Sequence, residues 1–486
     1  MSKIVILGAG ISGHTAAAHL RRKLGKDHEV LVVSPNRNYQ WVPSNIWIGI
    51  GRMKPKDVIF PLEPLYKRKG IGYKQAKVIS FHPDGNKLEE KPFVTVEYVF
   101  GDNLGTRENV TYDYLINATG PKLAFDLTDG LIPGTNKAYS VCTYDHAIHA
   151  SEALHKLIDQ LKVSDKKMKI LIGTGHAKAT CQGAAFEYIL NVEKELVNFG
   201  VRDKVEITWI SNEYALGDFG MDGMLLDYGG INMRSKDMIE MIFEDRDIKW
   251  ILGAGVNKVE DGIAHYENLE GEYKSEKFDF AMLIPAFSGH GFKAFDKNEN
   301  DITEKLFKGF MIVDADYTAK PYEEWTVQDW PETYQNPSFK NIFAPGIAFA
   351  PPHSISKPRK SKNGTEIFPA PPRTGMPSGI TAKLVADNII DSIKLGRESL
   401  HHKGSMGNMG AACIASAGFG MTKGSGVSIT TYPIVPDYIK YPKTGGRDIS
   451  KTFGDIGLAG HWVKLSLHYA FIWKAKMRPF WWLIPE

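Results

Sequence analysis

The N-terminal segment alternates apolar and polar stretches in the order of a strand, a turn, a helix and a second strand. Residues 3–7 are apolar and rich in β-branched side chains, which predicts a buried parallel strand. Residues 14–22 carry alanine and leucine among basic residues and predict a helix, and residues 30–33 predict the second strand. The expected unit is a strand–helix–strand crossover with parallel strands.

The same pattern recurs in the middle of the chain. Residues 167–172 predict a strand, Gly173 and Gly175 follow it, and residues 184–199 predict a helix. Other segments predict the return of the chain to the first unit: strands at residues 114–117, 310–314 and 341–346, a proline-rich loop at 351–372, and a helix at 374–393 with Pro377 near its first turn.

The first turn has the glycine spacing of a dinucleotide-binding loop. Gly8 permits the tight turn, Gly10 allows backbone to approach a pyrophosphate, and Gly13 allows the helix to pack closely on the strand. The helix N-terminus adds unpaired N–H groups and a positive dipole. Ser34 ends the second strand, where an acidic residue usually binds the ribose, and would bind it more weakly.

The second turn departs from this spacing, because Lys178 stands where the third small residue should be. We therefore expect FAD in the first unit and a poor or absent NAD(P)H site in the second. The predicted fold class is α/β, with two Rossmann-like dinucleotide-binding domains and a C-terminal membrane-associating element. The expected divisions are residues 1–165 and 301–394 for the FAD-binding domain, 166–300 for the degenerate second domain, and 395–486 for the C-terminal region.

Composition narrows the class of protein. The 486 residues are 43% hydrophobic, enough for more than one core, and the net charge of +3 is too small to favour a nucleic-acid partner. The predicted first strand begins at residue 3, so we expect no signal peptide ahead of it. No uninterrupted apolar stretch reaches the ~18 residues of a spanning helix, so any membrane contact is expected to be peripheral.

The chain contains three cysteines, Cys142, Cys181 and Cys413, which are too few and too scattered for a disulfide framework. Behind a dinucleotide-binding turn they indicate thiol redox chemistry beside a flavin. The alternative is that all three are small buried hydrophobic residues, a common role for free cysteine.

Several motifs, taken in order along the chain, resemble those of the sulfide:quinone oxidoreductase family of flavoproteins. They are the N-terminal glycine turn, residues 39–49, Cys142 with His146, Cys181 with Gly183 and Glu187, residues 373–377, Cys413, and residues 461–464. The resemblance implies that Cys181 and Cys413 form the redox pair on one face of FAD. It also implies that Cys142 lies near the flavin, to which some members attach it through a thioether.

Hydrosulfide, a soft nucleophile, would attack one sulfur of the Cys181–Cys413 bridge and leave a persulfide and a thiolate. Small neighbours such as Ala179, Ala411 and Ala412 would leave room for a growing polysulfide. Glu187 and His146 are candidates for proton transfer; a surface or capping carboxylate and a satisfied core histidine are the alternatives.

Asp218 occupies a position where many family members carry a histidine, and it would act as a base near neutral pH only if its pKa were raised. The remaining predicted cofactor contacts come from four segments. They are Pro43 and Ser44, Thr119 and Gly120, Gly346, and Gly375 with Met376, whose helix start would direct N–H groups at the flavin.

The C-terminal tail mixes aromatic and basic side chains. Trp473, Phe480, Trp481 and Trp482 lie close in sequence to Lys474, Lys476 and Arg478, a composition typical of a segment at a membrane surface. A C-terminal helix packed on the body of the protein is the alternative. The resemblance places Lys464 near a quinone carbonyl.

The predicted activity is oxidation of hydrosulfide through Cys181, Cys413 and FAD, with electrons passed to a membrane quinone. Three alternatives remain open at this level: a type II NADH:quinone oxidoreductase, the flavoprotein subunit of a flavocytochrome sulfide dehydrogenase, and a flavin-binding scaffold without turnover. A homo-oligomer is compatible with the same patterns.

Overall fold

A computed structural model describes residues 1–373, 375–418, 420–422 and 424–486. Its first sheet is built around β1 (Lys3–Leu7), which pairs in parallel with β2 (Glu29–Ser34) on one side and β8 (Tyr114–Asn117) on the other. Ile4, Val5, Ile6 and Leu7 are fully buried. The apolar, β-branched run therefore forms the central strand that its composition predicts.

The sheet has strand order β24-β8-β1-β2-β5-β6-β7, and β21 pairs with β5. The other strands are β5 (Gly72–His82), β6 (Phe93–Tyr98), β7 (Arg107–Thr111), β21 (Lys293–Ala294) and β24 (Ile342–Phe343). The predicted return strand at residues 310–314 is shorter than expected. Only β23 (Phe310–Met311) forms there, and it pairs with β22 (Phe307–Lys308) outside the main sheet.

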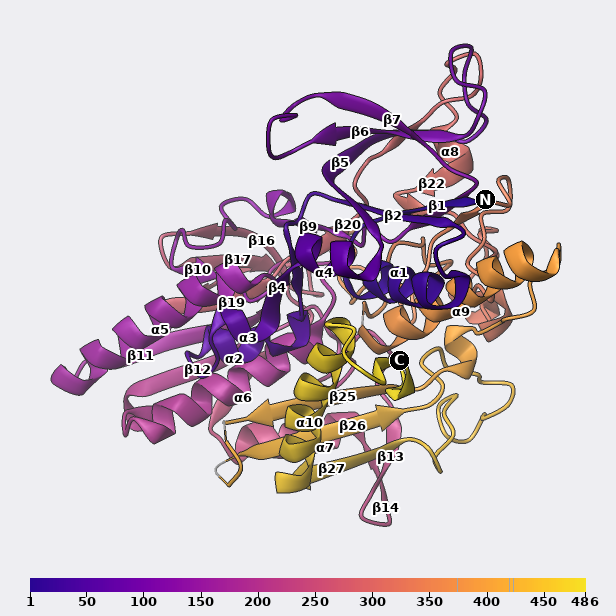
Figure 1. The fold of residues 1–486 in the computed structure, drawn as a ribbon. Coiled ribbons are helices and arrows are strands. Elements are labelled where there is room, and N and C mark those ends of the chain that lie inside the picture. The colour runs from indigo at the N-terminus through magenta and orange to yellow at the C-terminus, as the bar shows by residue number, and fades with distance from the viewer. Residues whose placement is uncertain (374, 419, 423) are drawn as a thin grey trace.

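The second sheet is parallel throughout and has strand order β10-β19-β11-β12-β15. Its strands are β10 (Ala138–Tyr139), β11 (Met168–Thr174), β12 (Val205–Ile210), β15 (Ile248–Ile251) and β19 (Phe280–Ile284). Helices α5 (Tyr144–Val163) and α6 (Gln182–Asn198) pack against it (Figure 1). The recurring strand–turn–helix pattern thus does build a second parallel sheet, as predicted.

A third sheet joins distant parts of the chain in the order β14-β13-β27-β26-β25. Its strands are β13 (Leu225–Tyr228), β14 (Ile231–Arg234), β25 (Ala411–Ala417), β26 (Ser425–Thr431) and β27 (Phe453–Gly457). Helix α10 (Leu458–Ala475) lies across β25, β26 and β27 (Figure 1). β25 also packs on α6, so the C-terminal region is joined to the second sheet.

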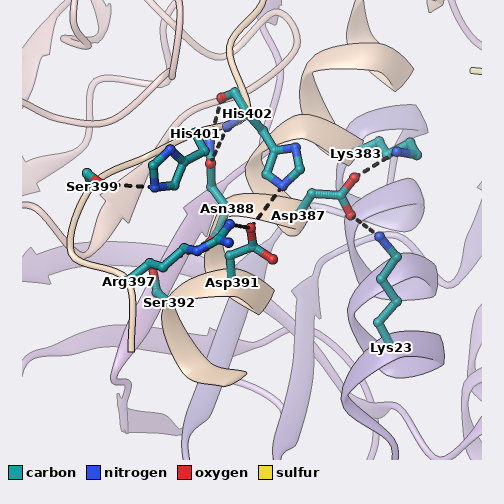
Figure 2. A network of polar contacts seen from close by, with 10 residues as sticks. All are labelled: Lys23, Lys383, Asp387, Asn388, Asp391, Ser392, Arg397, Ser399, His401 and His402. Carbon is teal, nitrogen blue, oxygen red and sulfur yellow. Dashed lines mark hydrogen bonds and ion pairs between the residues drawn. The ribbon is translucent and has the colours of Figure 1, made fainter. Parts of the chain in front are cut away.

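Helices α1 (Ile11–Leu24) and α9 (Gly375–Leu395) pack side by side under the first sheet (Figure 1). Figure 2 shows the polar contacts at this interface, where Asp387 of α9 pairs with Lys23 of α1 and with Lys383, each at 2.7 Å. Asn388 and Asp391 on α9 bind the segment that follows it, through His402. These contacts fix α9 on the helix that follows the glycine turn.

Shorter elements complete the fold. They are β3 (Asn38–Gln40), α2 (Asn45–Gly49), α3 (Pro55–Val58), β4 (Ile59–Pro61), α4 (Leu62–Lys69), β9 (Lys122–Ala124), α7 (Ser235–Glu244), β16 (Gly255–Glu260), β17 (Ile263–Glu267), β18 (Tyr273–Lys277), β20 (Ala286–Ser288) and α8 (Thr303–Leu306). Within the described residues, no helix has the length and apolar character needed to cross a membrane. The membrane-associating element remains a prediction.

Candidate active site

One cavity of about 980 Å³ connects the first glycine turn with all three cysteines. Its walls include Gly8 and Gly10 from the turn after β1, Cys142, and Cys181 with Cys413. A volume at the upper end of the range for ligand sites is enough for a large cofactor together with a small substrate. Residues far apart in the sequence thus meet at a single site.

The glycine turn has the shape that a dinucleotide pyrophosphate requires. Gly8 has a φ of +97°, and a Cβ there would lie 2.3 Å from the carbonyl oxygen of Ala118. A Cβ on Gly13 would lie 2.0 Å from the carbonyl oxygen of Gly8, whereas a Cβ on Gly10 would have no heavy atom within 4 Å. α1 starts beside this open space with no side-chain cap, so its first N–H groups remain available to an anion. The residues therefore fit FAD.

Ser34 and Thr119 also line the cavity, and both are held by local hydrogen bonds. The backbone N–H of Asn36 donates to Ser34 Oγ at 3.2 Å, which leaves the Ser34 hydroxyl proton free for a ribose. Thr119 Oγ1 donates to Asn117 Oδ1 at 2.8 Å. Pro43, Gly120 and Gly375 are further predicted contacts on the cavity wall.

Cys181 stands at the start of α6, where it is the N-cap residue and adopts the left-handed conformation with a φ of 69°. Its Sγ lies 3.7 Å from the carbonyl oxygen of Arg373. Cys413 lies in β25, and a Cβ on Gly183 would be 2.9 Å from Cys413 Sγ. The lack of a side chain at Gly183 therefore lets β25 bring Cys413 against the first turn of α6, next to Cys181.

All three cysteines are free thiols in this structure. Burial raises the pKa of Cys142 and of Cys413 to about 11 and that of Cys181 to about 12. Unpaired thiols at these positions therefore stay protonated at neutral pH.

Glu187 and Lys464 form a buried ion pair on the cavity wall between α6 and α10, with Lys464 Nζ 2.9 Å from Glu187 Oε2. The N–H of Ser416 donates to the other carboxylate oxygen at 3.2 Å. Burial raises the pKa of Glu187, and the attraction of Lys464 opposes that effect. Two predicted residues thus meet as one unit beside Cys413.

Five predicted residues do not lie on the cavity wall formed by the described part of the chain. They are Gly13, Ser44, His146, Gly346 and Met376. Thr374, part of the predicted motif before Met376, lies outside the described residues.

Most of these five residues make packing or polar contacts behind the cavity wall. Gly13 and Gly346 permit close packing, since a Cβ on Gly346 would lie 2.0 Å from Ser12 Oγ. Ser44 Oγ contacts His468 Nδ1 at 2.8 Å. His146 packs edge-on against Phe125, and burial lowers its pKa. These positions support the site from behind its wall.

Two cavity residues were missed as individual candidates. Arg373 donates to the carbonyl oxygens of Ile347 and Phe349 at 3.1 and 3.2 Å, and burial lowers its pKa to about 10, so it remains a cation. His290 also lines the cavity, and burial lowers its pKa. Arg373 could have been found from the sequence, because it begins the motif at residues 373–377. The residues around His290 form no motif that would single it out.

A buried pair of carboxyl groups supports the cavity wall behind Phe219 and Met221. Glu213 Oε1 accepts from the N–H of Phe219 at 2.8 Å, and Asp218 Oδ1 accepts from the N–H of Gly220 at 3.0 Å and from Ser356 Oγ. Burial, and next the charge of Asp218, raise the pKa of Glu213 to about 8. Burial also raises the pKa of Asp218 to about 6, the direction that a neutral-pH base requires.

The tail is attached more firmly than the sequence suggests. Lys474 is buried and its Nζ lies 2.8 Å from Glu486 Oε1 and 2.6 Å from the carbonyl oxygen of Ile484. Trp481 is buried against His19. The expectation that Lys474 and Trp481 contact a membrane surface is wrong, because both are buried and hold the C-terminus on α1 and α10.

Comparison with known proteins supports the predicted class. The family model of the pyridine nucleotide-disulphide oxidoreductases matches residues 2–177. The sulfide-quinone reductase of Aquifex aeolicus (strain VF5) is 28% identical over 473 residues, covering 97% of this chain and 91% of that protein. The X-ray structure of the sulfide:quinone oxidoreductase from Aquifex aeolicus gives a TM-score of 0.72 at 26% identity, covering 98% and 92% of the two chains.

NDH2 from Plasmodium falciparum in complex with NADH gives a TM-score of 0.63 at 13% identity, covering 98% of this chain and 96% of that one. At that identity the likeness concerns the fold alone. The family match over residues 2–177 and the likeness to the Aquifex aeolicus structure over nearly the whole chain support the predicted α/β fold class. Within this class, the resemblance to the sulfide:quinone oxidoreductase family is confirmed, because it extends over nearly the whole chain.

The glycine turn yields a matched pair of substitutions. We expect Gly13→Ala to lower the free energy of unfolding by about 1–3 kcal/mol, because its Cβ would collide with the Gly8 backbone. Gly10→Ala should leave the stability of the flavin-free protein within about 1 kcal/mol, yet lower the flavin bound per chain, because its Cβ enters the space for the pyrophosphate. Thermal unfolding and flavin absorbance measure both effects; full flavin content in Gly10→Ala would contradict this account.

The buried carboxyl pair predicts a dependence of stability on pH. Glu213 keeps its proton in the folded protein up to about pH 8, whereas the unfolded chain releases it near the ordinary value of 4.5. Unfolding therefore releases a proton between these values, and stability falls as pH rises through them, by up to about 5 kcal/mol. Glu213→Gln should flatten this slope in denaturant titrations at pH 5–8. An unchanged slope would show that Glu213 ionises normally.

Proposed function

We propose that this protein is a sulfide:quinone oxidoreductase that uses Cys181, Cys413 and FAD. The observation that carries the proposal is the placement of Cys181 and Cys413 on the wall of the same cavity as the glycine turn. The names of the similar proteins from Aquifex aeolicus support it. With a cysteine pair beside a flavin site, the disulfide can react with a soft sulfur nucleophile and the flavin can accept the two electrons.

The donor half of the reaction begins with Cys181 and Cys413 joined as a disulfide. Hydrosulfide attacks one sulfur, forms a persulfide there and releases the other cysteine as a thiolate. The thiolate then bonds to the outer sulfur of the persulfide, which loses its proton, and the two electrons of that oxidation leave the pair. The product is a trisulfide bridge that carries one sulfane sulfur, and further hydrosulfide extends it.

Bound FAD supplies the electron chemistry, because it accepts two electrons and passes them to the quinone. The chain provides the surroundings. Ala411, Ala412 and Gly183 line the cavity beside the pair and leave space for added sulfur atoms. The Arg373 cation on the same wall favours an anionic substrate over a neutral one. Cys142, also on the wall, is our candidate for the sulfur that attaches FAD covalently.

The acceptor side of the proposal rests on the Glu187–Lys464 pair. Apolar residues at Val42, Pro43 and Ile46 line the same cavity and suit a quinone ring. We assign to Lys464 Nζ a hydrogen bond to the quinone carbonyl, and to Glu187 the proton that the reduced oxygen takes up. Burial already raises the pKa of Glu187, which favours its role as a proton carrier.

The proposed membrane face consists of exposed apolar side chains at the end of α10 and in the tail. Tyr469, Trp473, Phe480, Trp482 and Leu483 are all at least 39% exposed. Single exposed apolar residues are common on protein surfaces, but a group of this kind near basic side chains is typical of proteins that bind the membrane interface. A quinone dissolved in the membrane would reach the cavity from this side.

The decisive experiment on function follows flavin absorbance after anaerobic addition of sulfide. We expect wild-type flavin to bleach, and Cys181→Ser and Cys413→Ser each to slow bleaching at least ~100-fold, because serine cannot form the bridge that hydrosulfide attacks. A chemical reductant that needs no cysteine should bleach all three proteins equally, which controls for lost flavin. Bleaching at the wild-type rate in both variants would refute the cysteine relay.

The membrane face is tested by vesicle sedimentation. Phe480→Ser with Leu483→Ser should weaken binding to anionic phospholipid vesicles at least ~10-fold, because two exposed apolar side chains are lost. Leu88→Ser is the matched control, since Leu88 is 96% exposed but lies in the turn between β5 and β6. Equal binding by the wild type and the double variant would show that the membrane contact lies elsewhere.

A further inference from the structure

The second glycine turn is followed by a helix that starts unusually late. Only residues 8–10 separate the end of β1 from the start of α1, whereas residues 175–181 separate the end of β11 from the start of α6. These additional residues carry the first turn of α6 to the flavin-side cavity, where Cys181, Gly183 and Ala184 form part of the wall. The helix N-terminus that would bind a second pyrophosphate is therefore used to position Cys181.

Polar groups at the end of β12, where a dinucleotide site would bind the ribose, are already bonded within the chain. Asn212 Nδ2 donates to the carbonyl oxygens of Ala177 and Ala179, both at 3.0 Å. Glu213 accepts from Phe219 N and Ser211 Oγ, both at 2.8 Å. Both side chains are fully buried. A ribose would have to displace these bonds in order to be recognised.

A segment at residues 356–372, which we call the strap, crosses over the second turn. The N–H of Phe368 donates to Ala177 O at 3.1 Å, and the N–H of Ala370 donates to Ala179 O at 3.3 Å. Lys178 Nζ lies 3.2 Å from the centre of the Phe368 ring and 3.1 Å from Glu366. Lys178, which breaks the glycine spacing in the sequence, therefore holds the strap in place.

The strap also packs against β16, which lies beside the second turn. A Cβ on Gly255, which β16 places beside the turn, would lie 3.1 Å from Ala177 Cβ and 3.2 Å from Ile367 Cδ1. Glycine at this position therefore lets Ile367 insert between the turn and β16. Ile367 is 1% exposed, as expected of a side chain that fills a space.

The strap is fixed at its outer end as well. Thr365 Oγ1 donates to Glu267 Oε2 at 2.7 Å, and Ser361 Oγ donates to the other oxygen of the same buried carboxylate. Asn363 Nδ2 donates to Gly271 O at 2.7 Å. These bonds join the strap to β17 and to the turn that follows it, so its closed position does not depend on Lys178 alone.

We propose that the strap is a built-in plug of the second dinucleotide site, and that it determines the electron donor by excluding nicotinamide nucleotides. Electrons then reach the flavin only from the cysteine side. NDH2 from Plasmodium falciparum in complex with NADH shares this fold, so the fold by itself does not exclude a nicotinamide nucleotide. This inference goes beyond the proposed function, since it concerns a ligand other than sulfide or quinone.

The test uses NADH as the probe and two substitutions that remove the side-chain contact between the strap and the second turn. Lys178→Gly restores a small third residue in the turn, and Phe368→Ala removes the ring that packs on it. We expect the wild-type holoenzyme to show no saturable NADH binding below about 1 mM in equilibrium dialysis. The double variant should bind NADH at least ~10-fold more tightly than the wild type. Lys178→Arg keeps the cation over the ring and should behave like the wild type.

Sulfide-dependent bleaching of the flavin in the double variant is the control for correct folding. It requires no NADH, so it can be measured separately from NADH binding. A double variant that bleaches with sulfide but binds NADH no better than the wild type would overturn the proposal. So would saturable binding of NADH by the wild type with the same affinity as the double variant.

Hydrogen exchange on the wild type keeps the proposal testable if the double variant does not fold. A plug requires the N–H groups of Phe368 and Ala370 to be protected from exchange, because both are bonded to the turn. Exchange at the rate of an unstructured peptide would overturn the proposal, and protection unchanged by added NADH would support it.

Discussion

The approach of β25 to the first turn of α6 is the contact on which the rest of the site depends. Gly183 has no side chain, and a Cβ there would lie 2.9 Å from Cys413 Sγ. This absence of a single carbon lets a strand from the C-terminal region reach the N-cap of a helix in the second unit. α10 packs on β25 in turn, so the position of Lys464 beside Glu187 follows from the same approach. The cysteines proposed for the donor reaction and the ion pair proposed for the acceptor reaction therefore line one cavity.

The two glycine turns show how one local pattern can serve two purposes. In the first, the helix begins at once and its N-terminus faces the open space beside Gly10. In the second, the intervening residues bind Asn212 and the strap, and the helix begins at a cysteine. The backbone approach permitted by Gly173, whose Cβ would lie 1.7 Å from Ile210 O, is retained in the second unit. Close approach of β11 to the neighbouring strand β12 thus persists where the pyrophosphate site does not.

Sequence patterns predicted what depends on local periodicity. The strand at Lys3–Leu7, the strand at Tyr114–Asn117 and the helix after the second turn are all present, because each is defined by its own apolar spacing. The pairing of β13 with β27 was not predicted, since it joins segments more than two hundred residues apart. The burial of Lys474 was not predicted for a similar reason. An amphipathic composition does not reveal which residue will pair with a charged side chain, and here Glu486 pairs with Lys474. His146 was expected to transfer protons near the thiols, but it does not lie on the cavity wall.

The most direct test of the central claim is peptide mapping by mass spectrometry after alkylation of free thiols, before and after one equivalent of sulfide. The account predicts that the oxidised enzyme yields a peptide pair joined through Cys181 and Cys413, and that sulfide adds the mass of one sulfur atom to that pair or to one of its cysteines. Alkylation of both Cys181 and Cys413 in the oxidised enzyme, with no sulfur gained after sulfide, would contradict it.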